Sequence, residues 1–429
     1  MQKAFFHCFL IGFIILFSVA CGSSRNKQAP KINKPILYNP ASSSLHPLLG
    51  VFHISEKESQ LYIQLNTNEL IVNEANAEGV PKADLRIHYQ LFDCTEIENN
   101  KIVSDSATFI NSIEIKKQQR TIVFPIMIPV EQGHRYLLLV QITDLIRRNT
   151  VREFITVNKL SETSPQNFKI TALNGAPKLE KNIRINDVFR IVYQRRPVDR
   201  IFIKYSASQA PIPTSPLAPA PITDLSFKPD SIWEQSYSPN TNFMFGYEGI
   251  YLIQTDTTHQ EGLLLRNFGP SFPRENRTAI LVQPINYLAS ESEYRKLSEA
   301  ENPKKMLDNF WLATTGSTDK ARMQIRVFYT RMSYANQYFS DTREGWKTDR
   351  GMVYMVYGLP NNVFKGSDSE TWEYTRKQSN PVTFTFDRKP LPYCDEYYVL
   401  RRGDPQTTYW SLAIESWRNG RVFSLNDIE

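Results

Sequence analysis

The spacing of hydrophobic residues predicts a β-rich segment from Leu48 to about Leu160. Short runs rich in Val, Ile, Tyr and Phe alternate with polar residues there, separated by turn-like polar stretches. A period of two residues is typical of strands with one buried face, and several such strands in succession indicate a sandwich. Residues 48–160 are therefore predicted to form an antiparallel, immunoglobulin-like β-sandwich of about seven strands. The runs that we expect to be strands are 51–55, 60–66, 84–92, 121–127, 135–145 and 152–157.

A second β segment is predicted for residues 161–280, giving two tandem sandwiches. Its proline-rich stretch, 209–221 (QAPIPTSPLAPAP), cannot form a central strand because proline lacks a backbone N–H. We expect a stiff surface loop there, with a docking segment for a proline-recognising groove as the alternative. The expected strands are 168–173, 187–194, 200–206, 243–255 and 262–268.

The hydrophobic period becomes helical after Ile285. Apolar residues then recur three or four positions apart, which predicts helices over 285–300, 303–315 and 320–339. Strand-like runs follow at 352–360, 371–377, 381–387, 397–402 and 410–417. Residues 285–429 are therefore expected to form an α+β domain in which helices cover an antiparallel sheet.

The first residues are typical of a secretory signal. Lys3 precedes a 17-residue apolar run, Ala4–Ala20, and Cys21 follows small residues. This resembles a lipoprotein signal, although a branched aliphatic residue is usual where Ser18 stands. We expect residues 1–20 to be removed and Cys21 to carry acyl chains such as palmitate. A permanent signal-anchor helix is the alternative, and a run of 17 residues is at the lower limit for spanning a bilayer.

Residues 21–47 are expected to be a flexible tether, because they show no hydrophobic period. The sequence directly after Cys21 is basic at Arg25 and Lys27. Surface-exported lipoproteins of the Bacteroidetes usually carry acidic residues at this place. By that resemblance, the chain is expected at the outer membrane, facing the periplasm, with the lipid bilayer as one partner.

The net charge of +6 is concentrated at the amino-terminal end. Residues 1–34 contain five basic residues and no acidic one, which leaves +1 for residues 35–429. A nearly neutral body argues against nucleic acid as a partner, because nucleic-acid-binding domains usually carry a basic face.

Metal and disulfide chemistry have little support in the sequence. Outside the first 21 residues the cysteines are Cys94 and Cys394, in different predicted domains, so one long-range bridge is the most that could form. The histidines are scattered, and no Cys/His cluster has zinc-site spacing. Asp387, Asp395 and Glu396 could hold a cation, but acidic residues at strand ends are usually solvated. We therefore predict no metal and no cofactor.

One motif identifies a family resemblance. Gly345-Trp346-Lys347-Thr348-Asp349 is followed by Arg350 and Gly351, and the similarity continues through 371–374 and 384–387. Over about residues 285–429 the chain resembles the GWxTD-domain proteins. The resemblance implies a bacterial lipoprotein with a β-rich amino-terminal region. It implies no particular reaction, because the family is named for a motif.

The motif can be interpreted as structure or as chemistry. In the structural interpretation, Gly345 and Gly351 permit unusual backbone angles, Thr348 and Asp349 bond turn N–H groups, and Trp346 fills the core. Arg350 would then pair with a partly buried carboxylate such as Asp387. In the chemical interpretation, Thr348, Asp349 and Asp387 would be the first candidates for a site. We predict the structural role, with Lys347 included in the motif, and no catalytic residues.

The expected function is a membrane-anchored, non-enzymatic scaffold, adaptor or binding protein of the cell envelope. Its partners would be other envelope proteins, for example in a secretion, motility or assembly complex. The sequence lacks GxSxG, P-loop, HExxH and GxGxxG motifs. The alternative is an enzyme acting on envelope glycan or peptide, or a carbohydrate-binding protein.

Overall fold

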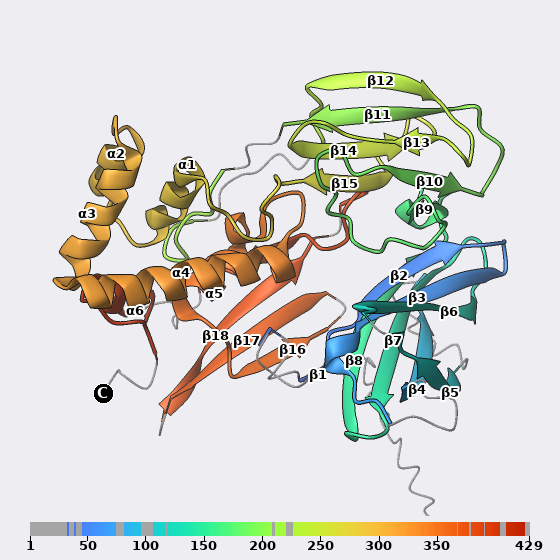
Figure 1. The fold of residues 1–429 in the computed structure, drawn as a ribbon, viewed down its shortest axis with the longest axis horizontal. Helices are drawn as coiled ribbons and strands as arrows, with labels where there is room; N and C mark the ends of the chain where they lie inside the picture. The colour runs from blue at the N-terminus through green and yellow to red at the C-terminus, as the bar shows by residue number, and fades with distance from the viewer. Residues whose placement is uncertain are drawn as a thin grey trace, which may run out of the picture.

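The computed structural model describes residues 32–33, 38–39, 45–73, 81–95, 106–116, 118–207, 211–219, 226–366, 368–376, 379–389, 391–403 and 409–424. The predicted signal, 1–20, and Cys21 lie outside these residues. Figure 1 shows an elongated molecule, with the helices and the β16-β17-β18 sheet toward one end and the sheets of β2 to β15 toward the other. The described strands form five antiparallel sheets, and the described α-helices lie in the carboxyl-terminal part of the chain.

The first β unit consists of two sheets, with strand orders β2-β3-β6 and β5-β4-β7-β8. Alternate residues of both sheets are buried in one shared hydrophobic cluster, as a period of two residues requires. Strand β5, which the hydrophobic pattern did not predict, is an edge strand. The elements are β2 (Leu48–His53), β3 (Glu58–Asn66), η1 (Thr67–Glu69), β4 (Lys82–Asp93), β5 (Ser106–Glu114), β6 (Thr121–Pro129), β7 (Arg135–Asp144) and β8 (Asn149–Asn158).

The second β unit also has two sheets, ordered β13-β10-β9 and β12-β11-β14-β15. Edge strand β12 was not predicted, because most of its residues are exposed. The single run expected over 243–255 is divided between β13 and β14. The elements are η2 (Pro165–Asn167), β9 (Phe168–Thr171), β10 (Phe189–Tyr193), β11 (Arg200–Ser206), β12 (Ser231–Ser236), β13 (Asn242–Phe243), β14 (Gly249–Gln254) and β15 (Leu263–Asn267).

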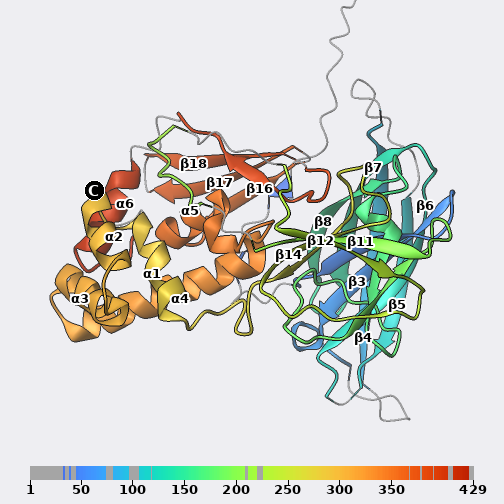
Figure 2. The same cartoon turned by 90° about the horizontal axis from the view of Figure 1, so that it is seen from above.

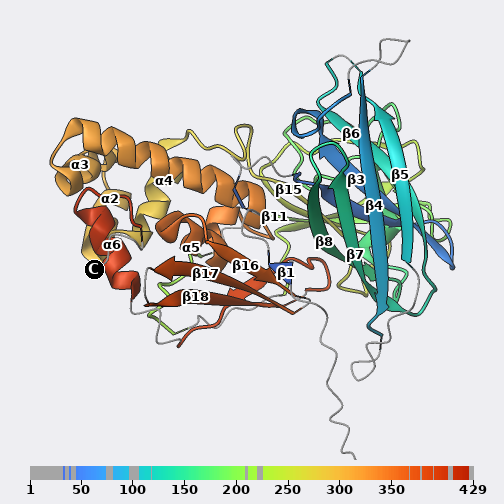
Figure 3. The same cartoon turned by 90° about the horizontal axis from the view of Figure 1, so that it is seen from below.

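The carboxyl-terminal unit has a sheet ordered β1-β16-β17-β18-β19, with helices on one face. Figures 2 and 3 show α5 lying between α4 and this sheet, and Figure 3 shows β1 beside β16. Its helices are α1 (Thr278–Val282), η3 (Gln283–Tyr287), α2 (Glu291–Ser298), α3 (Pro303–Thr315), α4 (Thr318–Phe339), η4 (Gly345–Lys347), α5 (Asp349–Tyr357) and α6 (Tyr409–Arg418). Its strands are β1 (Ile32–Asn33), β16 (Asn362–Lys365), β17 (Ser369–Arg376), β18 (Ser379–Arg388) and β19 (Tyr398–Leu400).

Two segments predicted as strands are helices. The run 352–360 lies largely in α5, whose residues are all buried, so its continuous apolar sequence fits a buried helix as well as a strand. The run 410–417 lies in α6, where Trp410, Ala413 and Trp417 form the buried face. Their spacings of three and four residues are helical. No helix in the described ranges is both long enough and apolar enough to span a bilayer.

The amino-terminal segment departs from the flexible tether predicted for 21–47. Its strand β1 pairs with β16, and Tyr38 is buried in the core of the carboxyl-terminal unit. Leu45, seven residues later, is buried in the core of the first β unit. The segment therefore connects two hydrophobic cores. The hydrophobic pattern did not indicate this because isolated apolar residues such as Tyr38 have no period.

The proline-rich stretch is a strap on the carboxyl-terminal unit. Of the predicted loop, residues 211–219 are described, and within them Pro213 and Pro216 are buried. Ile212 packs against the core that contains α4 and α5, and the carbonyl of Thr214 accepts a hydrogen bond from Arg402. The stretch lies at the surface, as the predicted surface loop does, and two of its prolines pack onto the body.

His53 gives the first β unit a defined dependence on pH. Its ring is 6% exposed, with Nδ1 2.8 Å from Ser59 Oγ and Nε2 3.0 Å from the carbonyl of Asn158. Burial lowers the pKa of His53 to about 4. The unfolded chain therefore gains a proton between pH 6.5 and 4 that the folded chain does not bind. Stability is lost across this interval, by about 3 kcal/mol at its acid end.

We expect the difference in unfolding free energy between wild type and His53→Gln to change across that interval. Glutamine can keep polar contacts without titrating, so the comparison removes the contribution of the carboxylates common to both chains. Denaturant titrations at several pH values between 4 and 7 measure it. A constant difference would show that His53 does not carry this dependence.

Candidate functional site

The motif lies where α4 meets the start of α5. After α4 ends at Phe339, residues 340–344 turn the chain into η4, and Thr348 begins α5. Thr348 is the N-cap: its Oγ1 accepts from the Gly351 N–H at 3.0 Å and donates to the Gly345 carbonyl at 2.7 Å. A threonine at this position satisfies an N–H that the first helical turn leaves free. The predicted turn-bonding role of Thr348 agrees with this geometry.

The two motif glycines permit close packing and do not adopt left-handed backbone angles. Neither is among the residues with positive φ. A Cβ on Gly345 would lie 1.8 Å from the carbonyl oxygen of Ala335 in α4, and one on Gly351 would lie 1.9 Å from the carbonyl oxygen of Gly345. The predicted reason for these glycines was therefore wrong: they are needed because three backbone segments touch.

Gly345→Ala is accordingly expected to destabilise the chain by about 1–3 kcal/mol or more, because the backbone of α4 must move away. Gly246→Ala is the matched control: a Cβ there meets nothing within 4 Å, and the φ of Gly246 is not positive. Thermal unfolding of both variants measures the contrast. Equal melting temperatures for the two variants would contradict the close approach.

Trp346 and Lys347 make contacts that hold the turn in place. The ring of Trp346 is fully buried, and the carbonyl of this residue accepts a 2.7 Å hydrogen bond from the hydroxyl of Tyr287. Lys347 pairs with Glu344 at 2.5 Å, and its ammonium lies 5.1 Å from the centre of the Trp346 ring. As predicted, Trp346 is part of the core.

Asp349 joins α5 to the end of the sheet. Its Oδ2 accepts from the Leu400 N–H of β19 at 2.9 Å, and its Oδ1 is 3.1 Å from Arg402 Nη2. Arg402 also donates to the carbonyl of Thr214 in the proline-rich strap. A carboxylate at the first position of a helix also interacts favourably with the helix dipole. Asp349 therefore bonds strand β19 and Arg402, which in turn contacts the proline-rich strap, and not the turn N–H groups that were expected.

Arg350 pairs with Glu370 and not with Asp387. Its Nη1 lies 3.3 Å from Glu370 Oε2, and both side chains are buried. Burial disfavours the charged guanidinium, but Glu370, together with the smaller effects of Tyr38, Tyr398 and Glu396, outweighs it and raises the pKa of Arg350. The guanidinium also lies 3.9 Å from the centre of the Tyr398 ring. Asp387 forms an ion pair with Arg401 nearer the surface. The predicted Arg350–Asp387 pair was therefore wrong.

Glu370 is the residue that sequence reasoning missed. It is fully buried, and its Oε1 accepts from Trp372 Nε1 at 2.5 Å and from the Tyr38 hydroxyl at 2.6 Å. The sequence did contain a signal for its burial. Glu370, Trp372 and Tyr374 are every second residue of β17 and so share one face, and the two aromatic residues belong to the hydrophobic core. A glutamate in that series must face the core and needs a cation.

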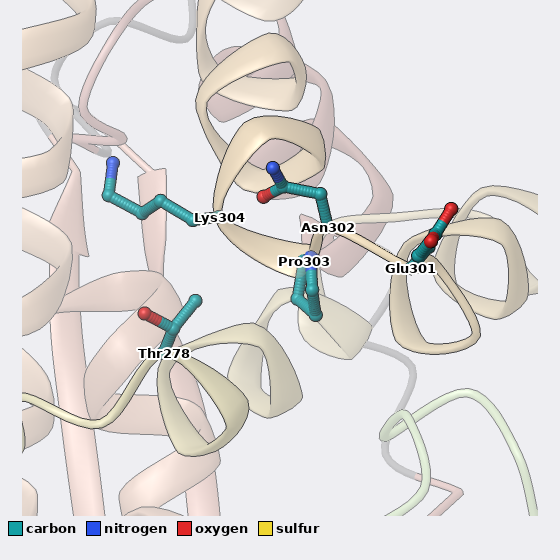
Figure 4. A pocket seen from close by; sticks show the side chains of 5 residues that line it. All are labelled: Thr278, Glu301, Asn302, Pro303 and Lys304. Atoms are coloured by element: carbon teal, nitrogen blue, oxygen red, sulfur yellow. The ribbon is translucent and has the colours of Figure 1, made fainter.

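Two open surface pockets of the described residues lie away from the motif. One lies where α3 begins (Figure 4), and there Asn302 already caps the helix while Lys304 pairs with Asp308. The other lies between α2 and α6, beside the ion pair of Arg418 and Glu293. None of the residues lining either pocket belongs to the motif. The lining residues of the first are Thr278, Glu301, Asn302, Pro303 and Lys304.

The remaining candidate residues do not form a metal site. Across the described ranges, no group of three or more His, Cys, Asp or Glu side chains could hold a metal ion. Cys94 is half-buried and Cys394 is buried, and both are free thiols. Burial raises the pKa of the Cys394 thiol to about 11.

Comparison with known proteins gives one match that carries an argument. Residues 249–419 match the model of the GWxTD domain. This match begins at β14, before the boundary predicted at residue 285. Side chains of β14 and β15 also share a small hydrophobic cluster with Tyr393 and Cys394, so these strands contact the carboxyl-terminal unit.

The other comparisons carry no argument about fold or function. No curated protein matches the chain. Two structures of β-glucuronidases from Bacteroides uniformis are similar over 32% of this chain, at 12% and 14% identity with a TM-score of 0.17. The chain covers 16% of each of those proteins. The motif geometry and the matched residues together lead to one identification: the chain contains a GWxTD domain, at residues 249–419.

Proposed function

We propose that this protein is a non-enzymatic scaffold or adaptor of the cell envelope, held to the outer membrane by an acylated Cys21 and facing the periplasm. The observation that carries the proposal is the use of the motif side chains within the domain. Thr348 caps α5, Asp349 bonds β19 and Arg402, and Arg350 neutralises Glu370. Because these side chains bond other parts of the domain, they support a role of the motif in folding. The enzymatic alternative drew on Thr348, Asp349 and Asp387, and Asp387 instead pairs with Arg401.

The β units supply surface that suits a protein partner. Ile232 and Trp233 on edge strand β12 are 56% and 37% exposed, and Tyr247, before β14, is 73% exposed. Aromatic residues are enriched in protein interfaces, and an edge strand presents free backbone groups. Immunoglobulin-like sandwiches, which we propose for residues 48–160 and 161–280, are common in binding proteins.

The amino-terminal segment limits how far the body can lie from the membrane. Strand β1 begins eleven residues after Cys21, and a chain of that length spans at most about 40 Å when fully extended. The longer tether predicted for 21–47 would reach more than twice as far. Under this proposal the edge of the GWxTD domain at β16 stays within this distance of the lipid.

Cross-linking at native expression tests the adaptor role. Mild cross-linking of cells followed by purification of the chain is expected to recover envelope proteins with it. Tyr247→Ser should reduce that recovery, whereas Ile110→Ser, which changes another exposed apolar residue on edge strand β5, should not. Recovery of the chain alone would count against an adaptor.

Protease treatment and acyl labelling test the location. Intact cells are expected to protect the body from added protease, and permeabilised outer membranes are expected to expose it. Cys21→Ser should abolish labelling with a palmitate analogue. Digestion of the body in intact cells would place it on the outer surface and contradict the proposed orientation.

A further inference from the structure

The GWxTD domain contains a built site for a tyrosine side chain. The Tyr38 ring is 5% exposed and lies between three aromatic residues of the domain. The centres of the neighbouring rings are 4.7 Å away for Phe339, 5.5 Å for Trp372 and 5.6 Å for Tyr338. These distances are typical of favourable aromatic pairs. Helix α4 and strand β17 supply these walls.

The bottom of this site is polar and charged. Tyr38 donates its hydroxyl proton to Glu370 Oε1 at 2.6 Å, while Arg350 holds the other oxygen of that carboxylate. Burial, together with the adjacent Glu370 charge, raises the pKa of Tyr38 well above its usual value, so the phenol remains a donor. A hydrogen bond to a buried charge is among the stronger kinds. Phenylalanine could fill the ring space but could not donate this bond.

The backbone around Tyr38 is also held. The Tyr354 hydroxyl of α5 donates to the Tyr38 carbonyl at 3.0 Å. Upstream, β1 pairs with β16 in antiparallel register, with Ile32 opposite Lys365 and Asn33 opposite Phe364. The site thus contacts the amino-terminal segment in two ways, through main-chain pairing at β1 and through the Tyr38 side chain. Peptides that bind by strand addition are recognised in the same two ways.

We infer that the GWxTD domain is a receptor for a tyrosine-bearing segment, that strand β1 (Ile32–Asn33) and Tyr38 of the same chain are its ligand, and that Arg350 and Glu370 recognise the tyrosine. The motif arginine therefore has a binding role in addition to its place in the core. Through Glu370, Arg350 helps to hold the amino-terminal segment on the domain. The inference concerns contacts within one chain and requires neither acylation nor a partner.

A disulfide across the β1–β16 pair tests the docking. The full-length chain carrying Asn33→Cys and Phe364→Cys, purified in detergent at low concentration, is expected to form an intramolecular bond under mild oxidation. Mass spectrometry of the linked peptides identifies it, and Asn33→Cys alone controls for the native cysteines. Absence of the bond would overturn the inference. A disulfide-linked dimer would also overturn it, because the ligand would then come from a second copy.

Substitutions at the tyrosine test its recognition. In the paired-cysteine chain, Tyr38→Phe is expected to lower the effective concentration of the two thiols by about tenfold, the equivalent of one hydrogen bond to a buried charge. Tyr338→Phe is the matched control, because it removes a neighbouring phenol that does not contact Glu370. The Tyr38→Phe chain keeps the aromatic ring and is therefore expected to fold. Tryptophan fluorescence checks that it does. Equal thiol effective concentrations in the Tyr38→Phe and Tyr338→Phe chains would overturn the role of Glu370 and Arg350.

Discussion

Replacing Arg350 by methionine is expected to destabilise the GWxTD domain by about 3–5 kcal/mol. The substitution keeps most of the side-chain volume but removes the cation that faces Glu370 in the core. The carboxylate is fully buried, so it cannot be solvated in place. Its remaining partners are the neutral donors Tyr38 and Trp372. Unfolding in denaturant, followed by fluorescence, measures the change.

Two comparisons separate the buried charge from other effects of the substitution. Adding Glu370→Gln to Arg350→Met should restore part of the lost stability, because the double variant buries no charge while keeping an acceptor for Tyr38 and Trp372. Arg401→Met breaks the more exposed pair with Asp387 and should change stability by about 0.5 kcal/mol or less. A similar small effect for Arg350→Met would contradict the buried pair.

The strand and helix positions could be predicted where one period dominated the sequence. The alternating runs of the β units and the three-to-four spacing of α3 and α4 are examples. The run 352–360 has neither period, because every residue of α5 is buried. In α5, the capping by Thr348 and the positive φ of Gly358 after its last turn mark the ends of a helix. Those local signals were more informative than the apolar run itself.

The composition of the site was only partly predictable, because its key partners are distant in sequence. Tyr38 and Glu370 are 332 residues apart, and no local pattern joins them. Arg402 and Thr214 are similarly separated. By contrast, Trp346 and Thr348 act within η4 and the start of α5, and their structural roles could be inferred from residue types alone. The distant contacts depend on how the three units fold back on one another.

Trp346 gives the second large expected effect. Trp346→Ala should remove about 3–5 kcal/mol from the stability of the GWxTD domain, because a fully buried indole leaves a cavity between elements that cannot all collapse. Trp233→Ala, on the partly exposed edge strand β12, should cost less. Five of the six tryptophans lie within the GWxTD domain, so fluorescence reports chiefly on its unfolding.

If the GWxTD motif holds the domain together, the unfolding free energy of the full chain carrying Trp346→Ala must fall. The expected result is a loss of about 3–5 kcal/mol in the transition seen by tryptophan fluorescence. An unchanged transition, together with loss of the partners recovered by cross-linking, would contradict it and make Trp346 a contact residue.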